Sequence, residues 1–166
     1  MASGTTAKLL HVDLTTRQTR TEIVPETTVR KYLGGGALAS YLLLRDLPAG
    51  VDPLGPDNVL VFTTSVINGL SLSGTNRYTA AAKSPLTGTI KESNAGGTAA
   101  QCFARLGVKA LIIEGLPEKD TFYNLHVDKN GVTIQEEKEL VGKWNYEVMK
   151  TLIKKHGDKI GILSIG

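Results

Sequence analysis

Two short segments hold the residues best suited to chemistry. One is Thr75-Asn76-Arg77-Tyr78, and the other is the glycine-rich run Asn94-Ala95-Gly96-Gly97. A guanidinium such as that of Arg77 presents a planar fork of donors to a phosphate or carboxylate. Asn94–Gly97 precedes a predicted helix, where backbone N–H groups can bind an anion that glycines allow to come close. Each segment also has a plainer interpretation: an exposed ion pair for Arg77 and an ordinary helix cap at Asn94.

The predicted strands bring these two segments together. Arg77–Lys83 and Thr89–Ser93 have strand patterns, and Ser84-Pro85-Leu86-Thr87-Gly88 between them supplies turn residues. A hairpin of this kind places Arg77 and Asn94 at the same end of a sheet. The sequence therefore predicts one site for an anionic ligand, formed by Arg77, Asn94, Ala95, Gly96 and Gly97.

Other residues of reactive type give weaker signals. Gly34-Gly35-Gly36-Ala37-Leu38-Ala39 contains the dinucleotide pattern Gly-x-Gly-x-x-Ala, but a predicted helix precedes it where that fingerprint needs a strand. A tight turn between two helices is the favoured interpretation. His11, His126 and His156 lie in different elements without metal-ligand spacing, and the single cysteine, Cys102, lies inside a predicted helix. We assign no catalytic residue and no metal ligand within these 166 residues.

The remaining pattern predicts an α+β fold with mixed or antiparallel sheets and packed helices. Hairpins and helices alternate without a regular βαβ order. A hairpin–helix–strand theme recurs, which leaves an internal duplication open. The other predicted elements are strands at 8–14, 19–24, 59–64, 108–114, 122–127, 132–136 and 160–165. Helices are predicted from about 25, at 37–47, from the Asn94–Gly97 run to about 106, and at 146–155.

Composition excludes several classes of protein. Net charge is +3 and aromatic residues make up only 5%, so the basic stripe and stacking residues of a nucleic-acid-binding protein are missing. No apolar run is long enough to cross a membrane, and residues 1–8 show no signal-peptide pattern. One cysteine cannot form an intrachain disulfide, so a reducing, cytoplasmic location is expected.

Several runs together resemble the N-terminal domain of the aldehyde:ferredoxin oxidoreductases. The similarity extends over nearly the whole chain. The matching runs are 10–16 (Leu-x-Val-Asp-Leu-Thr-Thr), 32–36 (Tyr-Leu-Gly-Gly-Gly), 52–58 (Asp-Pro-Leu-Gly-Pro-Asp-Asn), 76–88 (Asn-Arg-Tyr through Lys-Ser-Pro-Leu-Thr-Gly), 93–97 (Ser-Asn-Ala-Gly-Gly) and 105–115.

The resemblance implies a function and a cofactor. Members of this family bind tungsten, sometimes molybdenum, through two pterins (bis-molybdopterin, or tungstopterin), each carrying a phosphate. A 4Fe-4S cluster lies nearby. They oxidise aldehydes to carboxylic acids and pass electrons to ferredoxin. The N-terminal domain is the base on which the pterins rest, and the family's pterin contacts map to Arg77, Asn94 and Gly96. The expected partners are the remainder of the oxidoreductase, ferredoxin and the aldehyde, and a homo-oligomer stays open.

Two departures from the family pattern leave an alternative open. Ser65-Val66-Ile67-Asn68-Gly69 stands where the family often has Gly-Pro-Leu-Thr-Gly. Residues 1–166 are also expected to be a pterin-binding domain truncated before its C-terminal end, inactive in isolation, because the cluster cysteines and the catalytic acid and histidine come later in the family. The alternative is a non-catalytic scaffold or subunit that keeps the fold and binds a phosphate-bearing ligand or a protein partner.

Overall fold

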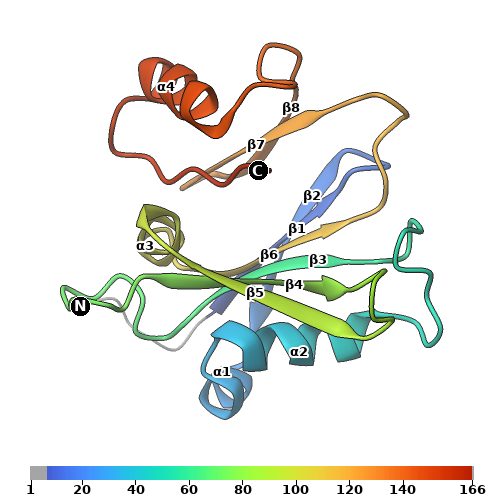
Figure 1. Ribbon diagram of the computed structural model, residues 1–166. Coiled ribbons are helices and arrows are strands. Elements are labelled where there is room, and N and C mark those ends of the chain that lie inside the picture. The colour runs from blue at the N-terminus through green and yellow to red at the C-terminus, as the bar shows by residue number, and fades with distance from the viewer. Residues whose placement is uncertain (1–6, 166) are drawn as a thin grey trace.

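The computed structural model describes residues 7–165, which form one six-stranded sheet, one two-stranded sheet and four helices (Figure 1). Residues 1–6, where the sequence predicts no signal peptide, and Gly166 lie outside the described residues. The strands are β1 (Ala7–Asp13), β2 (Gln18–Val24), β3 (Leu60–Thr64), β4 (Arg77–Lys83), β5 (Ile90–Gly96), β6 (Val108–Glu114), β7 (Tyr123–Asp128) and β8 (Gly131–Glu136). The helices are α1 (Glu26–Tyr32), α2 (Gly35–Asp46), α3 (Thr98–Arg105) and α4 (Asn145–His156).

The larger sheet is mixed, with the strand order β2-β1-β6-β3-β4-β5. Only β1 and β6 run parallel among the paired strands of this sheet in the described chain, and the other neighbours are antiparallel. This arrangement confirms the α+β class. Hairpin–helix–strand does recur along residues 7–114, and the duplication remains a hypothesis.

Each face of the sheet is covered by its own apolar cluster. Leu38, Ala39, Leu42 and Leu43 of α2 pack on one face, because leucines and small residues repeat at helical spacing there. On the other face, Phe103 of α3 packs together with the apolar side chains of the β7–β8 hairpin. Figure 1 shows α1 and α2 below the sheet and α3 above it.

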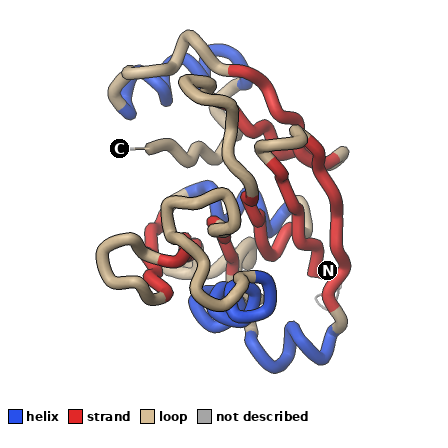
Figure 2. Tube along the Cα trace, turned by 90° about the vertical axis from the view of Figure 1, so that its right-hand side faces the viewer, coloured by secondary structure: helices blue, strands red, loops and turns tan. Residues whose placement is uncertain are grey.

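The C-terminal segment differs from the sequence prediction. Residues 160–165 form no strand in the structure, although their apolar pattern predicts one. A strand needs a neighbour to bond with, and within the described residues this segment packs by its side chains instead, with Leu163 in the cluster of α3 and β7–β8. Figure 2 shows this end of the chain on the side of the sheet away from α1 and α2.

Helix α4 is only loosely attached to the rest of the chain. Of the three residues predicted to face inward, Val148 is buried, Leu152 is half-buried and Ile153 is exposed. In residues 7–165 no helix has the length and apolar character needed to cross a membrane.

Candidate functional site

The register of the β4–β5 hairpin decides which predicted residues meet. Arg77 lies opposite Gly96, and Thr79 lies opposite Asn94. Residues that face each other across a ladder, and those two positions along a strand, project on the same side of a sheet. Arg77, Asn94 and Gly96 therefore share one face, the face that α2 covers further along at Thr79 and Ala81.

The start of α2 stops short of the end of this hairpin. Its first turn lies against Thr79, whose Oγ1 is 3.7 Å from where a Cβ on Gly35 would stand. Arg77, Asn94 and Gly96 are all exposed. The sheet end that carries the predicted site residues is thus left open on the α2 face.

The guanidinium of Arg77 is available to a ligand. Arg77 is exposed at the first position of β4, and it takes part in none of the ion pairs found among residues 7–165. The plainer interpretation, an exposed salt bridge, therefore finds no acidic partner in the described chain. An unpaired arginine keeps its full donor fork for an anion.

Asn94 is held by a residue that the sequence analysis missed. The buried hydroxyl of Thr79 donates a hydrogen bond to Asn94 Oδ1 at 2.6 Å. The signal was present in the sequence: Thr79 stands two positions after Arg77 in a strand, so both side chains are on the same face.

The glycine-rich run does not open the helix as predicted. Asn94, Ala95 and Gly96 are the last residues of β5, and α3 begins at Thr98 with Gly97 as its N-cap. The strand extends this far because β4 offers partners up to Arg77, and Gly97 N–H then donates to the Asn76 carbonyl at 3.2 Å. Asn94 is therefore a strand residue and not a helix cap.

Gly96 and Gly97 serve different purposes. Gly97 has φ +125°, a conformation that glycine adopts without strain. A Cβ on Gly96 would meet only the Asn76 carbonyl oxygen, at 3.9 Å, which is an ordinary contact. Nothing in the described chain therefore requires glycine at position 96, and the missing side chain leaves space in front of the strand. Ala95 pairs with Tyr78 and projects on the opposite face.

The Gly34–Gly36 turn is structural, as the helix-first context predicts. A Cβ on Gly34 would stand 2.2 Å from Thr64 O, and one on Gly36 would stand 2.1 Å from a carboxylate oxygen of Glu92. The buried hydroxyl of Thr63 also donates to Gly35 O at 2.8 Å. The glycines let α2 approach the sheet. The Glu92 carboxylate lies at the N-terminal, positive end of α2, which is where the phosphate of a dinucleotide would have to bind, so the turn is not a dinucleotide site.

The loop between β3 and β4 is fixed next to the candidate site. Asn68 is buried, accepts a hydrogen bond from Ser65 N and donates one to Thr75 O. Lys109 Nζ donates to the carbonyl oxygen of the same Ser65 at 3.2 Å, and burial lowers the pKa of this amine. The loop sequence that departs from the family pattern is therefore anchored at both ends, and it delivers Asn76 and Arg77 to β4. The side-chain oxygen of Asn76 is buried and has no donor in the described chain.

The histidines lie elsewhere and are less isolated than their spacing suggests. His11 Nε2 lies 3.0 Å from a carboxylate oxygen of Glu22 in the β1–β2 hairpin. His126 and His156 stack with ring centroids 5.0 Å apart. Burial, together with the charges of His126 and Lys155, lowers the pKa of His156. Cys102 is half-buried in α3.

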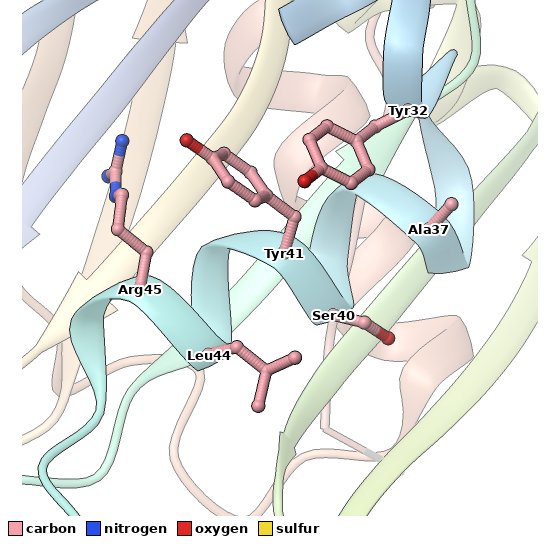
Figure 3. A pocket seen from close by; sticks show the side chains of 6 residues that line it. All are labelled: Tyr32, Ala37, Ser40, Tyr41, Leu44 and Arg45. Carbon is pink, nitrogen blue, oxygen red and sulfur yellow. The ribbon is translucent and has the colours of Figure 1, made fainter.

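A shallow hollow on the outer side of α1 and α2 is separate from the predicted site (Figure 3). Tyr32, Tyr41 and Arg45 line it, together with Ala37, Ser40 and Leu44. The two tyrosine rings stack with their centroids 4.2 Å apart. The guanidinium of Arg45 forms ion pairs with the carboxylates of Glu22 and Asp46, with N–O distances of 2.7 Å and 2.6 Å. With its cation paired and its aromatic faces stacked, this hollow offers a ligand little to bind.

Known proteins are similar to this chain in both sequence and fold. The family model described as aldehyde ferredoxin oxidoreductase, N-terminal domain, matches residues 9–166. The tungsten-containing aldehyde ferredoxin oxidoreductases of Pyrococcus abyssi and Pyrococcus furiosus are 36% and 33% identical to it over 164 residues, which is 98% of this chain and 27% of each relative. The WOR-like subunit of an aliphatic sulfonate oxidoreductase from Pyrococcus furiosus is 28% identical over 163 residues, 92% of this chain and 24% of that protein.

A solved structure has a similar fold. The active site complex BamBC of benzoyl coenzyme A reductase, in complex with 1,5-dienoyl-CoA, superposes with a TM-score of 0.84 and 26% identity, covering 90% of this chain and 22% of that one. The chain thus spans about a quarter of the length of the curated relatives. With a family model matched over nearly all of its residues, the chain belongs to the aldehyde ferredoxin oxidoreductase N-terminal domain family.

Proposed function

We propose that this chain is the cofactor-bearing base of a tungsten- or molybdenum-dependent aldehyde:ferredoxin oxidoreductase. One observation carries the proposal: Arg77, Asn94 and Gly96 share a face at an end of the sheet that α2 leaves uncovered. The relatives named as tungsten-containing aldehyde ferredoxin oxidoreductases support the choice of cofactor.

The residues present fit a phosphate-bearing pterin. Arg77 offers a guanidinium without an acidic partner in the described chain, and charge-assisted bonds to phosphate oxygens are among the stronger hydrogen bonds. Asn94 supplies an amide on the same face, and Gly96 removes the side chain that would keep a flat ligand away from the strand.

The metal–pterin group and the residues of this chain have different tasks in the proposed enzyme. When bound, the metal–pterin group supplies the redox chemistry of aldehyde oxidation. Arg77, Asn94 and Gly96 bind and orient that group, and none of these three residue types is suited to general acid–base catalysis. A 4Fe-4S cluster needs four thiolates as a rule, so Cys102 alone does not hold one, and we assign cluster ligands and ferredoxin contacts to other parts of the oxidoreductase.

The names of the relatives support a role in binding the cofactor over a role in choosing the substrate. An aldehyde enzyme and a sulfonate enzyme both contain regions similar to this domain. A part common to both is better suited to a task that both reactions share. A single cysteine and the absence of a disulfide framework suit a reducing, cytoplasmic setting.

Gly96→Val in the complete polypeptide tests the proposal. The valine fits the strand but fills the space in front of it, so pterin and tungsten per chain should fall at least tenfold, measured by fluorescence of the oxidised pterin and by elemental mass spectrometry. Ser93→Val is the matched control, because Ser93 is exposed on the same strand and pairs with Ala80 on the opposite face. Wild-type pterin content in Gly96→Val, at an unchanged melting temperature, would exclude this site and favour the non-catalytic scaffold.

A further inference from the structure

Thr79 is a buried polar residue beneath the candidate site. It is 2% exposed, and the first turn of α2 covers it, with its Oγ1 3.7 Å from the position of a Cβ on Gly35. A buried hydroxyl must give its proton to an acceptor or lose the free energy of its hydration. Its acceptor is Asn94 Oδ1, 2.6 Å away on the neighbouring strand.

This bond fixes which way the Asn94 amide faces. An amide has an acceptor end and a donor end, and it can rotate to exchange them. Because the Thr79 proton engages the oxygen, the amide nitrogen and its two N–H groups face away from Thr79. The exposed side of Asn94 is thereby a pair of donors on the same face as the guanidinium of Arg77.

We propose that Thr79 is a positioning residue for the cofactor, acting through Asn94. It holds the amide so that Asn94 only donates, and the ligand atoms at Asn94 are therefore hydrogen-bond acceptors: phosphate oxygens, or the ring carbonyl and nitrogens of a pterin. The inference rests on the proposed function, since it takes the ligand at this face to be the pterin. It adds the residue that sets the polarity of the site.

Two substitutions of Thr79 in the complete polypeptide separate positioning from packing. Thr79→Val keeps the shape of the side chain and removes the hydroxyl, and Thr79→Ser keeps the hydroxyl and removes a methyl group. We measure the rate at which pterin leaves the anaerobically purified protein on warming, along with tungsten per chain. Thr79→Val should lose pterin roughly five- to tenfold faster, the effect of about one oriented hydrogen bond. Thr79→Ser should stay within about twofold of wild type on the same scale.

Thr64→Val is the matched control. Thr64 is 1% exposed, and its hydroxyl donates to Val108 O at 3.2 Å, away from Asn94. This variant removes an equally buried hydroxyl from the same sheet, so it should lower the melting temperature without changing the rate of pterin release. Equal pterin loss in Thr64→Val and Thr79→Val would mean that Thr79 contributes only to packing, and would overturn the inference.

Asn94 variants test whether Thr79 acts through the amide. Thr79→Val combined with Asn94→Ala should release pterin no faster than Asn94→Ala alone, because the group being positioned is already gone. Additive losses would overturn the inference. Asn94→Asp tests it even where Thr79→Val folds poorly, because Asn94 is exposed: an aspartate still accepts from Thr79 but has no donors, so pterin loss should be at least as large as in Asn94→Ala. Wild-type retention in Asn94→Asp would refute the donor role.

The pterin and tungsten content of the wild-type protein separates a failure of the proposed function from a failure of the role assigned to Thr79. Wild-type protein that contains neither pterin nor tungsten would overturn the proposed function, and the inference with it. Wild-type protein that contains both, with Thr79→Val indistinguishable from it, would overturn only the role of Thr79.

Discussion

Replacing Gly34 by alanine should destabilise the domain strongly. Gly34 has φ +116° and ψ −167°, a conformation almost confined to glycine, in which an alanine costs about 1–3 kcal/mol. Its Cβ would also stand 2.2 Å from Thr64 O and 2.7 Å from Ser65 Cα. Both neighbours are backbone atoms and cannot rotate away, so relieving the overlap should cost about 1–3 kcal/mol more.

The expected loss of unfolding free energy is therefore about 2–6 kcal/mol, or roughly 4–24 °C in melting temperature for a chain of this size. Gly50→Ala measures the cost of a positive φ without any overlap, because Gly50 has φ +76° and nothing within 4 Å of an added Cβ. It should lose only about 1–2 kcal/mol. Gly96→Ala should melt within about 2 °C of wild type, since Gly96 has neither strain nor a close neighbour.

Differential scanning calorimetry on the four proteins measures these differences directly. The expected order of stability is wild type and Gly96→Ala highest, then Gly50→Ala, then Gly34→Ala. If Gly34→Ala melts within 2 °C of wild type, α2 does not approach β3 as closely as described. The structural explanation of the Gly34–Gly36 turn would then be wrong.

Two further predictions concern charge. Arg77→Lys in the complete polypeptide should fold normally but bind the cofactor about ten- to hundredfold less tightly. A single ammonium cannot replace the bidentate hydrogen bonds of a guanidinium, which are worth about 1.5–3 kcal/mol. Wild-type metal content together with wild-type turnover would mean that Arg77 is only an exposed residue. Glu22→Gln should make the melting temperature less sensitive to acid. Partial burial raises the pKa of the Glu22 carboxyl, but hydrogen bonds from Arg45 and His11 outweigh that effect and hold the pKa below its ordinary value. The bonds therefore stabilise the fold above the ordinary pKa, and their contribution is lost as the pH falls through the lowered one. Melting temperatures at pH 6 and pH 3 check this, and an identical drop in wild type and variant would contradict it.

Periodicity and turn residues were enough to predict most of the fold. The hairpins, the two helices around Gly34–Gly36 and the central strands follow from alternating apolar residues bounded by glycine and proline. The strand order could not be predicted, because β6 lies between β1 and β3, and no local pattern specifies that arrangement. The pattern at 160–165 failed for the same reason: a strand-like sequence needs a neighbouring strand, and local sequence does not supply one.

The choice of Arg77, Asn94 and Gly96 as site residues comes from the sequence and stays a prediction, whereas their geometry comes from the structure. Pairing Arg77–Lys83 with the next strand correctly placed Arg77 beside the glycine-rich run. The sequence pattern ends this strand at Ser93, whereas β5 extends to Gly96, so the pattern assigns Asn94 to a helix start and does not pair it with Thr79. Glycines at a strand end and at a helix start look alike in sequence, and only the register with β4 distinguishes them.

The β4–β5 hairpin has a consequence for the order of folding. Its turn closes locally, with Ser84 N–H donating to Thr89 O and Gly88 N–H donating to Ser84 O, both at 2.8 Å. The centre of the sheet forms only when β6 pairs with β1, which places Ala110 beside Leu9 although the two residues are far apart in the sequence. Short loops close at a lower entropic cost and therefore earlier than distant pairings. We therefore expect Arg77 and Gly96 to face each other early in folding, before the sheet that supports them is complete.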